Sequence, residues 1–212
     1  MFRFIDADAL PKNAVLTDDP LRAKMLAAHY LDNAALLCEK RGMVVFSGAY
    51  KGTEIAVVSC GFGASAAENY LCEMARAGVK TVVWTGECVS LTEKFALRSV
   101  IIARDSDENL VQRALDSVEL FGLPSVALCR VVTDDRCCIN GFDCEAPDGI
   151  LDFGSDAVFC CARKLGLTAV SLLTVSENAK NCTRVDDHER QSCFHDASRL
   201  CFEILALENA KI

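Results

Sequence analysis

The sequence contains no long hydrophobic run and little positive charge. None of its apolar stretches reaches the roughly 18 residues that a membrane-spanning helix requires, so we expect no contact with a membrane. Lysine and arginine number 22 against 30 acidic residues, for a net charge of −8. Without a basic stripe to neutralise a phosphate backbone, nucleic acid is set aside as a partner. Residues 1–13 lack the apolar run of a signal peptide, which predicts a cytoplasmic protein.

Histidine is scarce, with three residues, whereas cysteine is abundant, with thirteen. A metal site at Cys129, Cys137, Cys138 and Cys144 is disfavoured, because the group holds no C-x-x-C pair and has no nearby histidine. We therefore predict no metal and no cofactor. Many other cysteines lie in apolar segments of a chain without an export signal. We expect these thiols to be reduced and to pack as small hydrophobic side chains.

Repeats, linkers and low-complexity tracts are absent, and residues 1–212 are predicted to form a single domain. Short apolar segments alternate with amphipathic ones along the chain. Strands are predicted within residues 14–16, 43–50, 53–61, 80–87, 98–104, 124–133 and 168–178, and helices from Leu21, within 64–78, 108–122 and 154–166, and from about 187 to 208. This pattern predicts an α/β fold of three layers, with a mixed, mostly parallel central sheet covered by helices on both faces.

Ligands of such sheets bind beyond the carboxyl ends of the strands. The ends to inspect are therefore Thr17-Asp18, residues 60–63, residues 84–87, residues 133–135 and residues 176–178. The first of these ends passes directly into a helix, whose free N–H groups favour an anion. Its turn, however, carries two acids where a glycine would allow close approach.

Five segments, in order along the chain, resemble the purine nucleoside phosphorylase and uridine phosphorylase family, nearest to its bacterial hexameric kind. They are DPLRAKMLAAHYLD (19–32), RGMVVFSGAYKG (41–52), CGFGASA (60–66), LLTVSENA (172–179) and ERQSCFHDASRLCFEIL (189–205). The resemblance implies phosphorolytic cleavage of the N-glycosidic bond of a purine nucleoside or uridine. The implied partners are a nucleoside or base, phosphate, and further copies of the chain in a dimer or hexamer.

For phosphate, the resemblance implies binding by Arg22 from the first helix and by Arg41 from a neighbouring subunit. The family's turn glycine, strand-end arginine and nearby serine are replaced by Asp18, Trp84 and Glu87. Anion-binding groups are lost and acids enter, which predicts that phosphate is no longer held in the family's way. The alternative role of Arg22 is a structural ion pair with Asp18 or Glu87.

For the nucleoside, the family's Met-Glu pair at a helix start corresponds to Phe153 and Gly154, so the glutamate that holds the ribose is missing. Asp152 or Asp156 is a candidate to reach the ribose hydroxyls. The alternative is that both acids cap the helix N-terminus. Phe62 stands where a methionine faces the base, and its alternative is an ordinary core position.

For the leaving base, Glu177 stands at the position of the family's general acid, and Arg190 matches the arginine that assists it. The alternative for this pair is a surface ion pair near the last helix. A family loop that closes over the base is missing, because a helix begins soon after residue 104. Water would therefore be poorly excluded from the site.

Three hypotheses remain open: a nucleoside phosphorylase with an eroded site, a nucleoside hydrolase, and an inactive member that binds a nucleoside or base or serves in assembly. Changes in all three subsites favour the loss of catalysis. The four retained residues, Arg22, Arg41, Glu177 and Arg190, favour an enzyme. The sequence does not distinguish purine from pyrimidine.

Overall fold

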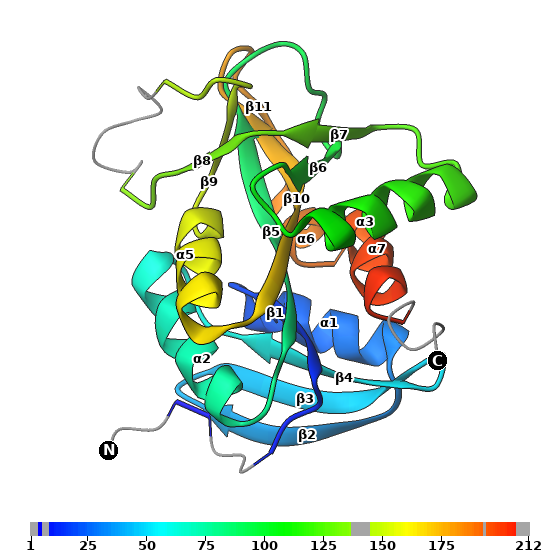
Figure 1. Cartoon of the computed structure of the whole chain (residues 1–212). Helices are drawn as coiled ribbons and strands as arrows, with labels where there is room; N and C mark the ends of the chain where they lie inside the picture. Colours follow the sequence, from blue (N-terminus) through cyan, green and yellow to red (C-terminus); the bar gives the residue numbers. More distant parts are fainter. Residues whose placement is uncertain (1–3, 6–8, 137–144, 193, 207–212) are drawn as a thin grey trace.

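The computed structural model of the chain describes residues 4–5, 9–136, 145–192 and 194–206 (Figure 1). Within this part, eleven strands form one sheet, whose main path runs β2-β3-β4-β1-β5-β10-β6-β7. The strands are β1 (Asn13–Thr17), β2 (Asp32–Lys40), β3 (Met43–Tyr50), β4 (Thr53–Ser59), β5 (Thr81–Ser90), β6 (Val100–Ala103), β7 (Val126–Cys129), β8 (Val131–Thr133), β9 (Ile150–Asp152), β10 (Thr168–Asn178) and β11 (Thr183–Arg184). The helices are α1 (Pro20–Tyr30), α2 (Ala64–Arg76), α3 (Glu108–Phe121), α5 (Ser155–Leu165), α6 (Asp187–Ser192) and α7 (His195–Ala206).

The centre of the sheet is parallel and is buried on both faces. Strand β1 pairs in parallel with β4 and β5, and β10 pairs in parallel with β5. Strand β6 then runs antiparallel to β10, which makes the sheet mixed, as the sequence predicted. Because β1, β4, β5 and β10 point the same way, their carboxyl ends meet at one edge.

Two layers of helices cover this sheet, as Figure 1 shows, with α2 and α5 on one face and α1, α3 and α7 on the other. Each face has its own hydrophobic cluster. The first includes Leu71 of α2 and Val158 of α5, and the second includes Leu26 of α1 and Phe202 of α7. The three-layer α/β prediction is therefore confirmed.

The segment 124–133, predicted as one strand, forms two short strands with different partners. Strand β7 pairs with β6, whereas β8 pairs with β9. Arg130 lies between them, and its backbone N–H donates to Asp148 Oδ2 at 2.6 Å. This side-chain bond satisfies the amide where the chain changes partner strand.

The predicted helix from 187 to 208 is also divided, into α6 and α7. Phe194 lies between the two helices and is buried, with the guanidinium carbon of Arg22 5.4 Å from its ring centroid. The carbonyl of Phe194 accepts the first-turn bond of α7 from the Ser198 N–H, at 3.0 Å. The buried Phe194 therefore lies at a break between two helices, where the helical spacing of apolar residues had predicted one continuous helix.

Strands β2, β9 and β11 were not predicted, since β2 is an edge strand with almost wholly exposed residues and β9 and β11 have three and two residues. The prediction of a missing lid agrees with the structure, because β6 ends at Ala103 and α3 begins at Glu108. Among the described helices, none is long and apolar enough to cross a membrane. Cys137, Cys138 and Cys144 of the weighed metal cluster lie outside the described residues.

Candidate functional site

The candidate site lies where β1, β5 and β10 end and where α1 begins. Asp18 follows β1 directly, and the side chain of Asp19 caps α1 by accepting from the Leu21 N–H at 2.7 Å. Proline follows this cap at the first helical position, where its fixed φ favours helix initiation. The short turn therefore brings Arg22, one turn into α1, over the carboxyl ends of the central strands.

Arg22 is held by acids of this chain. Its side chain is 2% exposed, with Nη1 2.7 Å from Asp18 Oδ1 and Nη2 2.9 Å from Glu87 Oε1. Nη2 also donates to the backbone carbonyl of Arg190 at 2.8 Å. Burial lowers the pKa of Arg22, but the carboxylates of Asp18 and Glu87 outweigh it and the net shift of this pKa is upward. The guanidinium is therefore a buried, charged group with internal counter-ions, which agrees with the structural alternative predicted for it.

A second arginine extends this cluster across the sheet edge. Arg190 Nη1 lies 3.3 Å from Glu87 Oε2, and Arg190 Nη2 lies 3.8 Å from Glu177 Oε2. The structure thus brings the proposed acid and its assisting arginine together. The side chains of Arg190 and Glu177 are 28% and 30% exposed, so this end of the cluster meets solvent. The contact of Glu87 with Arg190 was not predicted, because α6 is about a hundred residues away in sequence and no local spacing signals it.

Trp84 and Gly154 occupy one space on the other face of the sheet. The Trp84 side chain is buried, and a Cβ atom placed on Gly154 would lie 2.7 Å from Trp84 Cζ2. Side-chain atoms do not approach so closely, so the indole leaves room only for glycine at residue 154. The positions aligned with the strand-end arginine and the ribose glutamate are therefore filled by one ring.

Asp152 is fully buried and serves as a cap for α5. Its Oδ2 accepts from the N–H and the hydroxyl of Ser155 at 2.9 and 2.6 Å, and its Oδ1 accepts from the Thr133 hydroxyl at 2.5 Å. Burial raises the pKa of Asp152, although these hydrogen bonds oppose the shift. Asp156 is exposed in the first turn of α5. Of the two roles predicted for Asp152, the structure supports helix capping. Its carboxylate is enclosed by the protein and does not face a ligand.

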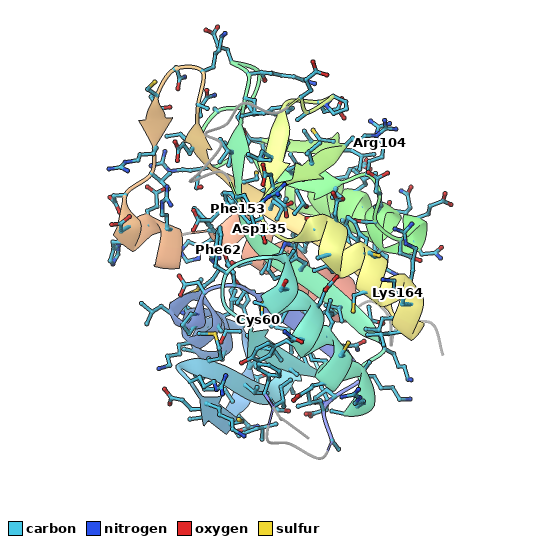
Figure 2. The ribbon with its side chains drawn as sticks, turned by 90° about the vertical axis from the view of Figure 1, so that its left-hand side faces the viewer. Cys60, Phe62, Arg104, Asp135, Phe153 and Lys164 are labelled. Carbon is cyan, nitrogen blue, oxygen red and sulfur yellow. The ribbon has the colours of Figure 1, made fainter. Side chains whose placement is uncertain are left out.

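Phe62 and Phe153 form an aromatic pair at the same edge, with ring centroids 5.0 Å apart and planes inclined at 40°. Figure 2 shows this pair beside Asp135, whose Oδ2 accepts from the Ala64 N–H at 3.0 Å and so caps α2. Phe62 is 56% exposed, which is unusual for a large apolar side chain. The core alternative for Phe62 therefore does not describe it, and its ring offers a surface for stacking a planar base.

Arg41 is exposed in the tight turn between β2 and β3, with positive φ at both Arg41 and Gly42. The turn lies at the same sheet edge, since a Cβ on Gly61 would be 3.7 Å from the sulfur of Met43. Its predicted role, in the phosphate site of a neighbouring subunit, stays a prediction.

The α/β sheet, with helices on both faces and parallel strands at its centre, has the fold of the nucleoside phosphorylases. A solved purine nucleoside phosphorylase from Toxoplasma gondii, in complex with immucillin-H, matches this fold with a TM-score of 0.87 over the whole of both chains, at 15% identity.

Sequence comparisons place the chain more narrowly. The family model described as "Phosphorylase superfamily" matches residues 12–136, more than half of the chain. The DeoD-type purine nucleoside phosphorylase of Bacillus subtilis is 31% identical, covering 86% of this chain and 88% of that protein. The DeoD-type enzyme of Alkaliphilus metalliredigens is 29% identical, covering 92% and 94%. The chain therefore belongs to the phosphorylase superfamily, as its sequence motifs predicted.

Proposed function

We propose that this protein binds a purine nucleoside or its free base at the described sheet edge, and that it cleaves ordinary nucleosides by phosphorolysis only weakly. The DeoD-type relatives are named as purine nucleoside phosphorylases, which supports a purine ligand over uridine. The exposed ring of Phe62, beside Phe153, supplies a stacking surface for the base. Glu177, assisted by Arg190, is the proposed group that stabilises or protonates the departing base.

The observation that carries this proposal is the state of Arg22. A phosphorylase must hold a phosphate dianion against the sugar. This requires cationic side chains that are not already paired with carboxylates of the protein. Here both terminal nitrogens of Arg22 are already bound to Asp18 and Glu87. At about 4 Å, a carboxylate and an incoming anion repel by about 4 kcal/mol at an effective dielectric near 20. The proposed site therefore disfavours phosphate while it keeps the groups that recognise a base.

Hydrolysis is a second candidate, and the short link from Ala103 to Glu108 favours it. Without a long loop at this position, water has access to the sheet edge, and a hydrolase needs water where a phosphorylase needs phosphate.

We also propose that the chain forms a homo-oligomer built on dimers through the hairpin that carries Arg41. Sedimentation velocity at micromolar concentration should then show no monomer. A cytoplasmic location stays a prediction.

Thermal shift and calorimetry test the main proposal. Inosine, adenosine, guanosine, hypoxanthine and uridine are each titrated with and without phosphate, and base release is followed by chromatography. A purine at 100 times its Kd should raise the free energy of unfolding by about 2.7 kcal/mol, with or without phosphate. Rapid phosphorolysis, or binding of phosphate alone at micromolar Kd, would contradict the proposed site, as would the absence of any purine binding.

A further inference from the structure

Two cysteines meet where α2 packs against α5, on one face of the sheet (Figure 1). Cys72 lies on α2 and Cys161 on α5, and both pack in the same hydrophobic cluster. The thiol of Cys161 donates to the backbone carbonyl of Glu68 at 3.8 Å. Glu68 stands one helical turn before Cys72, and residues four apart share a face of a helix. Cys161 therefore reaches the part of α2 that carries Cys72.

The two thiols also interact directly. Burial raises the pKa of Cys161 to about 12, and the neighbouring Cys72 adds to this rise through like charge and through a hydrogen bond between the side chains. Such a bond requires the two sulfur atoms to lie side by side. Both cysteines are free thiols in the structure. They are therefore a close, reduced pair that joins two helices.

The two members of the pair differ in their access to solvent. Cys161 is 6% exposed, whereas Cys72 is half-buried at the edge of the helix contact. A small oxidant in solution therefore meets the sulfur of Cys72 first. Cys161 waits behind it as a second thiol that the oxidant does not reach. A reactive cysteine beside a protected partner is the arrangement that allows reversible oxidation.

We propose that Cys72 and Cys161 form an oxidation site, at which a hydroperoxide converts the two thiols into a disulfide between α2 and α5. With hydrogen peroxide, the sulfur of Cys72 attacks one oxygen, so that an S–O bond forms and the O–O bond breaks. The other oxygen leaves with the proton of Cys72 as water, and Cys72 is left as a sulfenic acid.

The second step joins the helices. The sulfur of Cys161 attacks the sulfur of Cys72, so that the S–S bond forms and the S–O bond breaks. The hydroxyl leaves with the proton of Cys161 as a second water. In total, two thiols lose two electrons and one peroxide is reduced to two waters.

The disulfide would fix the separation of two helices that begin beside the aromatic pair. Phe62 lies just before α2 and Phe153 just before α5, and their ring centroids are 5.0 Å apart. A covalent bond within the same two helices limits how far their N-terminal ends can part. The oxidation site itself does not depend on nucleoside binding, so it stands or falls separately from the proposed function.

Peptide mapping under oxidation tests the inference. Wild-type protein is treated with hydrogen peroxide, the remaining thiols are alkylated, and the protein is digested after glutamate without a reductant. Cleavage after Glu68 and Glu73 releases Cys72 in a peptide with no other cysteine. This peptide should appear linked to the peptide that contains Cys161, and dithiothreitol should separate the two.

Three single variants assign the link. Cys72→Ser and Cys161→Ser should each abolish it. Cys160→Ser is the matched control, because it removes the adjacent thiol of α5 and should leave the link intact. Thermal unfolding shows whether each variant folds. If Cys161→Ser does not fold, mapping of the wild type and of Cys160→Ser identifies the partner of Cys72.

The linked protein should unfold at a Tm about 4 °C or more above that of the reduced protein, because a disulfide that fits the native structure stabilises it. A Tm that is unchanged or lower would show that the helices must distort to form the bond, and would overturn the built-in pair. Oxidation of Cys72 to a sulfinic acid, or its linkage to Cys160, would overturn it as well. So would an unmodified Cys72 at a peroxide concentration that oxidises the exposed Cys182.

Discussion

Arg22 Nη1 lies 2.7 Å from Asp18 Oδ1, four residues earlier in the chain, and this contact closes the turn between β1 and α1. In the family that the chain belongs to, the corresponding turn is expected to meet phosphate through a glycine amide. Here the turn instead supplies the carboxylate of Asp18, which pairs with Arg22 of the helix that follows. The same arginine that would attract an anion is thereby neutralised from within.

Restoring the family residues should create a phosphate site. We expect Asp18→Gly, Trp84→Arg and Glu87→Ser together to give measurable phosphate affinity, because they remove two acids and add a cation. The wild-type protein should show none. Isothermal titration with inorganic phosphate checks both, and micromolar binding by wild type would contradict our account of the turn.

Removing Arg22 should be costly. Arg22→Met leaves Asp18 and Glu87 without their shared cation, and breaking a buried ion pair in this way costs about 3–5 kcal/mol. Adding Glu87→Gln should recover part of the loss, since one uncompensated charge is gone. Urea denaturation of the single and double variants measures the two values. A double variant no more stable than the single one would show that Glu87 is not a partner.

Trp84 and Gly154 should be energetically coupled. Gly154→Ala should cost about 1–3 kcal/mol, because the new methyl group meets the indole. In a Trp84→Leu background the same change should cost less, with a coupling energy of about 0.5–3 kcal/mol. Gly86→Ala is the control, since its Cβ would meet Asp18 Oδ1 at an ordinary 3.5 Å. Additive effects in the Trp84–Gly154 cycle would refute the contact.

Asp152 should make stability fall as pH rises from acid. Burial raises the pKa of Asp152, so the unfolded chain loses this proton first, near the ordinary pKa of about 3.9. Stability from this group is complete below that pH and is lost as the pH rises through the folded-state pKa. The quantity to compare is the slope of the unfolding free energy against pH, measured upward from the ordinary carboxyl pKa of about 3.9. Asp152→Asn should remove this component of the slope, even if the lost cap lowers stability at every pH.

Thiol reactivity should be confined to few positions. Among the nine described cysteines, Cys182 is exposed, whereas burial raises the pKa of Cys161 and of Cys201 to about 12 and leaves little thiolate near neutral pH. Brief alkylation followed by mass spectrometry should therefore label Cys182 well before Cys161 or Cys201. Labelling of Cys201 at a similar rate would contradict the structure, and stoichiometric zinc in the purified protein would contradict the prediction of no metal.

The parallel centre of the fold could be predicted because its strands are short, apolar and bounded by amphipathic helices. The edge strand β2 could not, because it is exposed on both faces and so carries no alternation. The boundary between α6 and α7 falls at Phe194, which is buried with its ring centroid 5.4 Å from the guanidinium carbon of Arg22. Such a break depends on tertiary contacts, and the local spacing of apolar residues does not predict it.

The site was predictable to the extent that it depends on local sequence or family motifs. Arg22 and its ion pair follow from the turn and from helical spacing. The meeting of Glu87 with Arg190 depends on how α6 packs, which no spacing encodes. The enclosure of Asp152 likewise depends on Thr133, contributed by a strand that the sequence analysis had merged with its neighbour.

The close contact of Trp84 with Gly154 also makes these two positions dependent on each other. While the indole keeps its place, a side chain at residue 154 has no room, since its Cβ would lie 2.7 Å from Trp84 Cζ2. A larger residue at position 154 therefore requires a smaller one at position 84. Single mutations toward a larger residue 154 are blocked, whereas paired changes at the two positions remain open.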